Sequence, residues 1–382
     1  IVNKAAKTIT YKIRTGANKS EIAKAKEGTK AGRGANFRCI ISDTAITPEY
    51  VKSKGQSGEM GQALIAIVAD GKAGRVYVDP NPDHESIALS TKPDRRPETM
   101  LPNDPRNFWT VDYGLTRFGD LFTDRQLVAL NTFSDLVHEA RVKIESDALA
   151  AGRSNDQNGL REGGTGAKAY AEAISIYLGF AVSKASTRNC ALAIWEHGMG
   201  RLAGALGRQT FPMQWTFAET NPLGGFGGDI AGTAKSVSEV LDQLRCPSHG
   251  SVTQRNAAEP SDRREFRVIS TDPPYYDNIE YADLSDFFYV WMRSSLGGIY
   301  PDLFGTLATP KADQLVASPH RHGGKEGATR FFLDGMSAAL RNIAAQSDPK
   351  YPSTIYYAFK QSEIAEEGIS STGWATFLEG VV

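Results

Sequence analysis

The sequence has few cysteines and no long apolar run. Three cysteines, Cys39, Cys190 and Cys246, are spread over 382 residues, and an odd number at such wide spacing does not make a disulfide framework. No apolar run approaches membrane-spanning length, and the first residues lack the charged-then-apolar pattern of a signal peptide. We therefore expect a chain from a reducing compartment, the cytoplasm, that has no membrane partner.

The chain also has almost no net charge, at -1, so its overall composition excludes the strongly basic class of nucleic-acid binders. The charges are unevenly distributed, however. Residues 1–38 contain ten lysines and arginines but only two acids, Glu21 and Glu27. This local excess of eight positive charges predicts either a phosphate-facing surface or a solvated basic face, and the residues alone leave both possibilities open.

The length predicts two or three structural regions. We expect 1–100 to be strand-rich, with a half-exposed strand near 9–13 and a hairpin whose strands lie within 63–68 and 75–78, joined by a longer loop. We expect 101–250 to be a mainly helical insert, the natural place for target recognition. Here Thr123 to Gln126 form a capping box. Within a helix over 167–185, Tyr170, Ile174, Tyr177 and Phe180 share a face that we expect to be core.

Residues 251–382 alternate strand and helix signals, the pattern of a parallel α/β sheet. A strand-like run over 266–271 ends at Asp272, an amphipathic helix follows over 284–296, and another strand is expected over 354–359. In open α/β sheets, ligands bind beyond the carboxyl ends of the strands. Asp272 is therefore well placed for function.

Asp272, Pro273, Pro274 and Tyr275 form the segment with the clearest chemistry. The prolines fix their φ angles and lack N–H donors, which makes a stiff loop. The Asp272 carboxylate and the Pro273 carbonyl can accept hydrogen bonds from an exocyclic amino group of a base and localise its lone pair. The base must leave the duplex stack to be reached, and Tyr275 can stack on it. The alternative is a turn in which Asp272 caps the next helix.

The run from Asp272 to Trp291 resembles the prokaryotic adenine-specific DNA methylases that contain a zinc ribbon. Shorter pieces over nearly the whole chain resemble them too, at 28–34, 120–127, 211–215 and 356–361. The resemblance implies a Rossmann-like methyltransferase catalytic half, S-adenosyl-L-methionine as cofactor, DNA as partner and base flipping, as in restriction-modification. It leaves any restriction partner unidentified. Asp272 is the residue expected near the cofactor, and Tyr275, Tyr276 and Asn278 are expected near the base.

The sequence also departs from the family pattern in two places. The Gly-rich cofactor loop expected upstream is missing; the Gly-rich run over 221–229 follows no clear strand, so a linker or a DNA-facing loop is favoured there. Cys39 and Ser42 stand where a Cys pair of the ribbon would begin. Four ligands are needed for structural zinc, so residues 1–100 would hold only a degenerate ribbon, and we expect no metal. Cys246 and His249 have ligand-like spacing but no second pair.

Three functions remain open. The first is a site-specific, adenine-specific DNA methyltransferase, although the chemistry at Asp272 does not distinguish adenine from cytosine. The second is a non-catalytic DNA- or partner-binding module, a fragment without a complete cofactor site, because the cofactor loop is missing and the N-terminal region is basic. The third is an RNA-base methyltransferase, since related loops also serve RNA. His320 and His322 have no partner that the sequence identifies.

Overall fold

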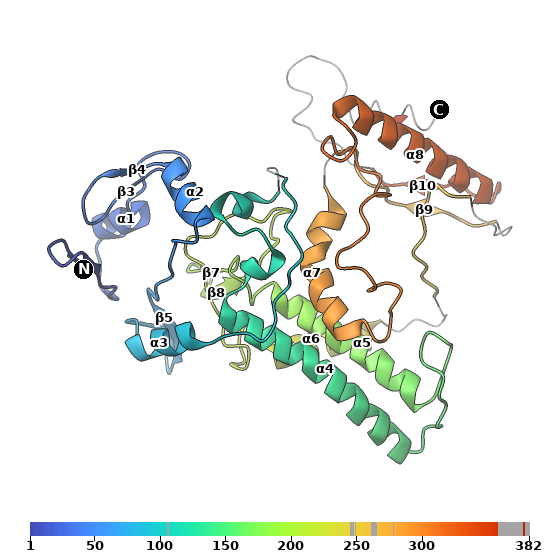
Figure 1. The fold of residues 1–382 in the computed structure, drawn as a ribbon. Coiled ribbons are helices and arrows are strands. Elements are labelled where there is room, and N and C mark those ends of the chain that lie inside the picture. Colours follow the sequence, from blue (N-terminus) through green and yellow to red (C-terminus); the bar gives the residue numbers. More distant parts are fainter. Residues whose placement is uncertain are drawn as a thin grey trace. The chain divides into compact units, whose positions relative to one another are not determined.

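The computed structural model describes residues 1–104, 107–244, 248, 250–260, 266–277, 279–357 and 377–378. The chain forms two compact units. Unit 1 comprises Ile1–Gln243 and Phe287–Ala308, and unit 2 comprises Leu244–Asp286 and Thr309–Val382. Both units contain helices and short strands, so the fold is mixed α/β, as expected (Figure 1). Among the described residues, no helix is both long enough and apolar enough to cross a membrane.

The strands of unit 1 are short and pair antiparallel in hairpins. The predicted hairpin at 63–78 is confirmed in kind, but its turn is tight, because Gly71 pairs with Gly74. The strand expected over 9–13 is wrong beyond Ile9. The strands are β1 (Val2–Asn3), β2 (Thr8–Ile9), β3 (Phe37–Arg38), β4 (Ala45–Ile46), β5 (Ile67–Gly71), β6 (Gly74–Val78), β7 (Ile194–Glu196) and β8 (Arg201–Ala203).

The first four helices of unit 1 begin at side-chain caps. Thr47 accepts a hydrogen bond from the Tyr50 amide at the start of α2, and Thr123 and Gln126 form the predicted capping box of α4. The helices of this unit are α1 (Lys19–Glu27), α2 (Pro48–Gln56), α3 (Pro82–Ser90), α4 (Asp124–Ala150), α5 (Ala167–Ser186) and α6 (Ile230–Gln243), with 3-10 turns at Trp109–Tyr113 and Phe118–Leu121.

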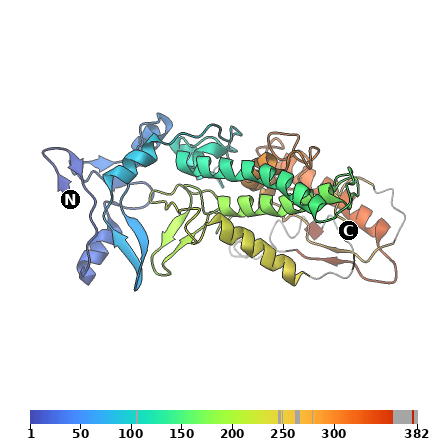
Figure 2. The same cartoon turned by 90° about the horizontal axis from the view of Figure 1, so that it is seen from below.

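The long helices α4, α5 and α6 pack side by side (Figure 2). The expectation that the aromatic face of α5 is core is wrong: Tyr170, Tyr177 and Phe180 are each about 40% exposed. The buried face consists of small residues instead, which let neighbouring helices approach closely. A Cβ at Gly179 would lie 2.9 Å from the Leu296 side chain. The buried residues of α5 include Ala167, Ala169, Ala171, Ser175, Gly179, Ala181, Val182 and Ala185.

Aromatic rings fill the core of unit 1. Phe211 is fully buried and packs against Phe108, with ring centroids 5.2 Å apart, and against Phe287, at 5.4 Å. Phe122 stacks on Phe287 at 5.5 Å. Residues 211–217 form no strand. The segment contributes the buried ring of Phe211 to the core.

Unit 2 contains the parallel strand pair β9 (Ser270–Thr271) and β10 (Thr354–Ile355). The helix α8 (Lys325–Gln346) packs its residues Phe332 and Met336 in one cluster with Ile355. The helix α7 (Tyr281–Leu296) begins in this unit. The predicted order of strand, loop, helix, helix and strand is confirmed. Both strands are shorter than predicted, and residues 358–359 of the second lie outside the described part of the chain.

The buried ring of Phe211 supplies a test of the unit 1 core. We expect Phe211→Ala to lower the free energy of unfolding by about 3 to 5 kcal/mol, since the neighbouring rings cannot fully close the cavity. Urea unfolding measures the change. Leu223→Ala is the control, because Leu223 is 75% exposed and its truncation should alter stability by less than about 0.5 kcal/mol. Equal stability of both variants would contradict this description of the core.

Candidate functional site

Asp272 directly follows β9, at the carboxyl end of this strand. The Tyr356 amide donates to the Thr271 carbonyl at 2.8 Å, and the Thr354 amide donates to the Ile269 carbonyl at 2.9 Å. These parallel ladder bonds bring the carboxyl ends of β9 and β10 to one edge. Asp272 is exposed there, whereas Pro273 and Pro274 are half-buried. The carboxylate therefore lies where α/β sheets bind ligands.

Tyr275 lies beside Asp272. Its hydroxyl donates to Asp272 Oδ1 at 2.8 Å. This hydrogen bond, together with some loss of hydration, raises the pKa of Tyr275 above its ordinary value, because deprotonation would place two negative charges side by side. Burial, and then the charge of Asp272, likewise raise the pKa of Tyr281. The raised pKa values keep the hydroxyl groups of Tyr275 and Tyr281 protonated next to Asp272.

Tyr276 points into the protein instead. Its ring meets Phe332 edge-on with centroids 5.2 Å apart, and its hydroxyl lies 2.8 Å from Thr329 Oγ1. Its backbone φ is 27°, in the left-handed region that side chains disfavour. The structure therefore brings Asp272 and Tyr275 together and places the Tyr276 ring against the core cluster. Asn278 lies outside the described residues.

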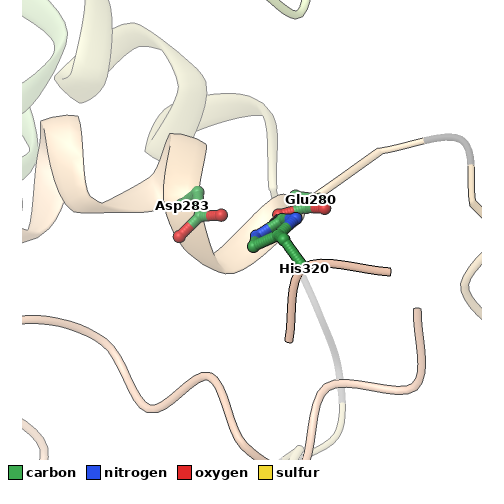
Figure 3. Close-up of side chains that lie close together, drawn as sticks. All are labelled: Glu280, Asp283 and His320. Carbon is green, nitrogen blue, oxygen red and sulfur yellow. Dashed lines mark ion pairs between the residues drawn. The ribbon is translucent and has the colours of Figure 1, made fainter. Parts of the chain in front are cut away.

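Buried charged groups lie at the far end of the same loop, where α7 begins. Glu280 and Asp283 are fully buried, and Figure 3 shows both side chains where α7 begins. Ser318 donates to Glu280 Oε1 at 2.7 Å. Arg321 pairs with Asp283 and lies 3.3 Å from Glu280 Oε2. These contacts tie the start of α7 to the segment at 318–321. We call these four residues the anchor cluster.

The anchor cluster holds two carboxyl groups against one guanidinium. Burial, and then the hydrogen bond shared with Glu280, raise the pKa of Asp283 from 3.8 to about 7. Burial acts in the same direction on Glu280, but its hydrogen bonds with Asp283 and Ser318 and the charge of Arg321 outweigh this effect and hold its pKa below its usual value. One proton is therefore shared between the two acids, with Glu280 as the charged partner.

Sequence reasoning missed the anchor cluster, although the spacing of its acids was a signal. Glu280, Asp283 and Asp286 follow each other at intervals of three, which places them near one face at the start of a helix, where negative charge is favourable. Asp286 is also buried, and Lys311 donates to it at 2.6 Å. The partners Ser318 and Arg321 lie 38 residues further along the chain.

His320 does have partners, which the sequence did not identify. Its Nδ1 lies 3.1 Å from Ser318 Oγ, and its Nε2 lies 3.6 Å from Glu280 Oε2. Glu280, Asp283 and His320 each offer a ligand atom within 4.8 Å of one another (Figure 3). A cation is geometrically possible there, but the Arg321 guanidinium already supplies positive charge to both acids. His322 stacks on Phe331, with centroids 3.9 Å apart.

The other candidate segments of the sequence lie in unit 1 or outside the described residues. The Gly-rich segment at 221–229 folds on itself: the Ile230 amide donates to the Pro222 carbonyl at 3.0 Å, and Asp229 Oδ2 accepts from the Gly232 amide at 2.7 Å, in the first turn of α6. The Ser42 amide points to Cys39 Sγ at 3.5 Å, in the β3–β4 hairpin, and hydrogen bonds with Ser42 lower the pKa of the Cys39 thiol. Cys246 and His249 lie outside the described residues.

No family model, curated protein or solved structure matches this chain. An exposed carboxylate beside a phenol, at the carboxyl edge of a parallel strand pair, can accept hydrogen bonds from a donor group on a planar ligand. The anchor cluster joins the start of α7, behind this loop, to the segment at 318–321.

The shared proton of the anchor cluster makes stability depend on pH. The raised pKa of Asp283 means that the folded chain keeps a proton that the unfolded chain loses above about pH 4. The resulting stabilisation is complete below pH 4 and is lost as the pH rises through about 7. In Asp283→Asn the amide cannot lose this proton and still donates to Glu280, so we expect wild type to lose stability relative to this variant between pH 5 and pH 8.

Urea unfolding of both proteins at intervals over this range measures the difference. Asp313→Asn, at an exposed aspartate of the same unit, should follow the wild-type pH profile. Parallel profiles for wild type and Asp283→Asn would show that the two acids share no proton.

Proposed function

We propose that this chain is an S-adenosylmethionine-dependent DNA methyltransferase that acts on the exocyclic amino group of a flipped base, adenine in preference to cytosine. The observation that carries the proposal is the position of Asp272: an exposed carboxylate at the carboxyl end of β9, in a proline-stiffened loop beside Tyr275. The preference for adenine and for DNA over RNA comes from the family resemblance of the run from Asp272 to Trp291.

The amine chemistry follows from what a carboxylate can do. The lone pair of an exocyclic amine is delocalised into the base ring, so the nitrogen is a weak nucleophile. Hydrogen bonds from its two N–H groups to Asp272 and the Pro273 carbonyl favour a pyramidal nitrogen with a localised lone pair. Fixed acceptors of this kind need no reorganisation during the reaction, and this is how preorganised electrostatics lower a barrier.

Tyr275 has two roles in this proposal. Its hydroxyl donates a hydrogen bond to Asp272 Oδ1. An incoming amine would replace the Tyr275 hydroxyl as the donor, so the carboxylate stays hydrogen-bonded throughout. The Tyr275 ring then offers a face on which the flipped base stacks, a contact worth about 1 to 3 kcal/mol per base. This stacking contact offsets part of the energy of unstacking the base from the duplex.

S-adenosylmethionine would supply a methyl group already activated on a sulfonium. The described residues do not assemble a site for it: the Gly-rich segment at 221–229 folds on itself before α6 and follows no strand. Asp272, Pro273 and Tyr275 act on the base. The Rossmann-like fold is likewise part of the proposal, supported by the order β9, α7, α8, β10 and the parallel pairing of the two strands.

Replacing Asp272 tests the proposal. We expect Asp272→Ala to lower methyl transfer from labelled S-adenosylmethionine to DNA by about 100-fold or more, because the amine loses a fixed acceptor. Stability should change by less than about 0.5 kcal/mol, since the side chain is exposed. Asp272→Asn retains one acceptor oxygen and should keep more activity than Asp272→Ala.

Asp313→Ala is the matched control, an exposed aspartate of unit 2 away from the loop, and should transfer methyl groups at the wild-type rate. Wild-type activity in Asp272→Ala would remove the assigned role.

A DNA-binding module without catalysis is the second candidate function, and the basic N-terminal residues favour it. All ten lysines and arginines of 1–38 are exposed. Only Lys12, Arg14 and Arg38 form ion pairs among the described residues, with Asp79, Glu21 and Asp43. The other seven cations are available for phosphate contacts. Salt-dependent DNA binding together with no affinity for S-adenosylmethionine would favour this module over the enzyme.

The lysines of α1 test the phosphate surface. We expect replacement of Lys19, Lys24 and Lys26 by alanine to weaken DNA binding and to reduce the slope of log K against log salt by about 2 to 3, since each phosphate contact contributes about 0.9. Fluorescence anisotropy across a salt series measures this slope. Replacement of Lys143 and Lys235, which pair with acids on their own helices, should leave it unchanged. An unaltered slope in the α1 variant would show that these cations are only solvated.

A further inference from the structure

Tyr357 reaches back from the end of β10 to the loop that carries Asp272. It lies two residues beyond β10. Its hydroxyl accepts a hydrogen bond from the Tyr276 backbone amide at 3.1 Å. The carbonyl of Tyr276 is held as well, by the Ala317 amide at 2.7 Å. The backbone of Tyr276 is therefore fixed on both sides, at the residue whose φ of 27° is strained.

The ring of Tyr357 also contacts Tyr275. The two rings meet edge to face, with centroids 5.3 Å apart and planes at 73°. Phe377 stacks against Tyr357 with centroids 4.0 Å apart and planes at 16°. The ring of Tyr357 thus has a partner of its own and does not depend on Tyr275 for its position. It can hold Tyr275 in the orientation from which the Tyr275 hydroxyl reaches Asp272.

We propose that Tyr357 is a positioning residue for the Asp272 loop: its hydroxyl holds the strained backbone of Tyr276, and its ring sets the orientation of Tyr275 beside Asp272. This inference rests on the proposed function and deepens it, because it assigns a role to the segment after β10. Tyr357 acts through Tyr275 and Tyr276 and need not touch the base.

Packing alone does not account for a tyrosine at this position. A phenylalanine would make the same ring contacts with Tyr275 and Phe377 and would avoid the loss of hydration of a hydroxyl. The hydroxyl instead satisfies the Tyr276 amide, which would otherwise lose its hydrogen bond. The contact joins the loop after β9 to the residue after β10, so it acts at the one edge where both strands end.

Tyr357→Phe tests the role of the hydroxyl, since it removes one hydrogen bond and keeps the ring. We expect kcat for methyl transfer to fall about 5- to 10-fold, the effect of losing one hydrogen bond of ordinary strength, while KM for DNA changes less than about twofold. Tyr357→Leu removes the ring as well and should lose more. Tyr356→Phe is the matched control, because Tyr356 is the adjacent tyrosine and is 60% exposed; its kcat should equal that of wild type.

Amide hydrogen exchange in the folded chain gives a readout that does not need activity. We expect the Tyr276 amide to exchange at least about tenfold faster in Tyr357→Phe, while the ladder amides of Thr354 and Tyr356 exchange at the wild-type rate. Unchanged exchange at Tyr276, or wild-type kcat in Tyr357→Phe beside an inactive Asp272→Ala, would overturn the role of Tyr357 and leave the proposed function standing. A wild-type chain that transfers no methyl group would contradict the proposed function itself, and with it the assignment of Tyr357 to that reaction.

Discussion

The parallel pairing of β9 and β10 is the constraint on which the candidate site depends. Its ladder bonds bring the ends of both strands to one edge, so that Asp272 leaves the first strand close to where Tyr357 leaves the second. The hydrogen bond from the Tyr276 amide to the Tyr357 hydroxyl then joins the two segments. The groups that hold the loop backbone at Tyr276 come from segments distant in sequence, since Tyr357 follows β10 and the Ala317 amide donates to the Tyr276 carbonyl.

The anchor cluster provides the second constraint, at the far end of the loop. Two buried carboxyl groups that face a single guanidinium would repel each other if both were charged, and a shared proton relieves this repulsion. Ser318 and Arg321 then join the start of α7 to another segment of unit 2. The loop therefore runs between a strand pair and a buried charge network, a rigid support of the kind that preorganised sites need.

Sequence patterns predicted what is local and missed what depends on distant contacts. Capping boxes, helices and the order of elements in unit 2 follow from neighbouring residues, and Asp272 was placed correctly because a short strand run precedes it. The aromatic face of α5 was predicted to be core but is exposed. Periodicity shows which residues share a face of a helix, but it does not show which face is buried, and in α5 the buried face consists mostly of alanines and other small residues. The roles of Ser318, Arg321 and Tyr357 require contacts between residues 38 to 81 positions apart, which no local pattern encodes.

The function proposed for this chain requires that a methyl group reach an exocyclic nitrogen of DNA. The most direct measurement is nucleoside mass spectrometry of DNA from cells that express the chain while fed trideuteromethyl methionine, with cells lacking the chain as the reference. We expect a trideuteromethyl group on the exocyclic nitrogen of adenine, present only when the chain is expressed. Folded wild-type chain in such cells with no labelled amino-methylated base in DNA would contradict it.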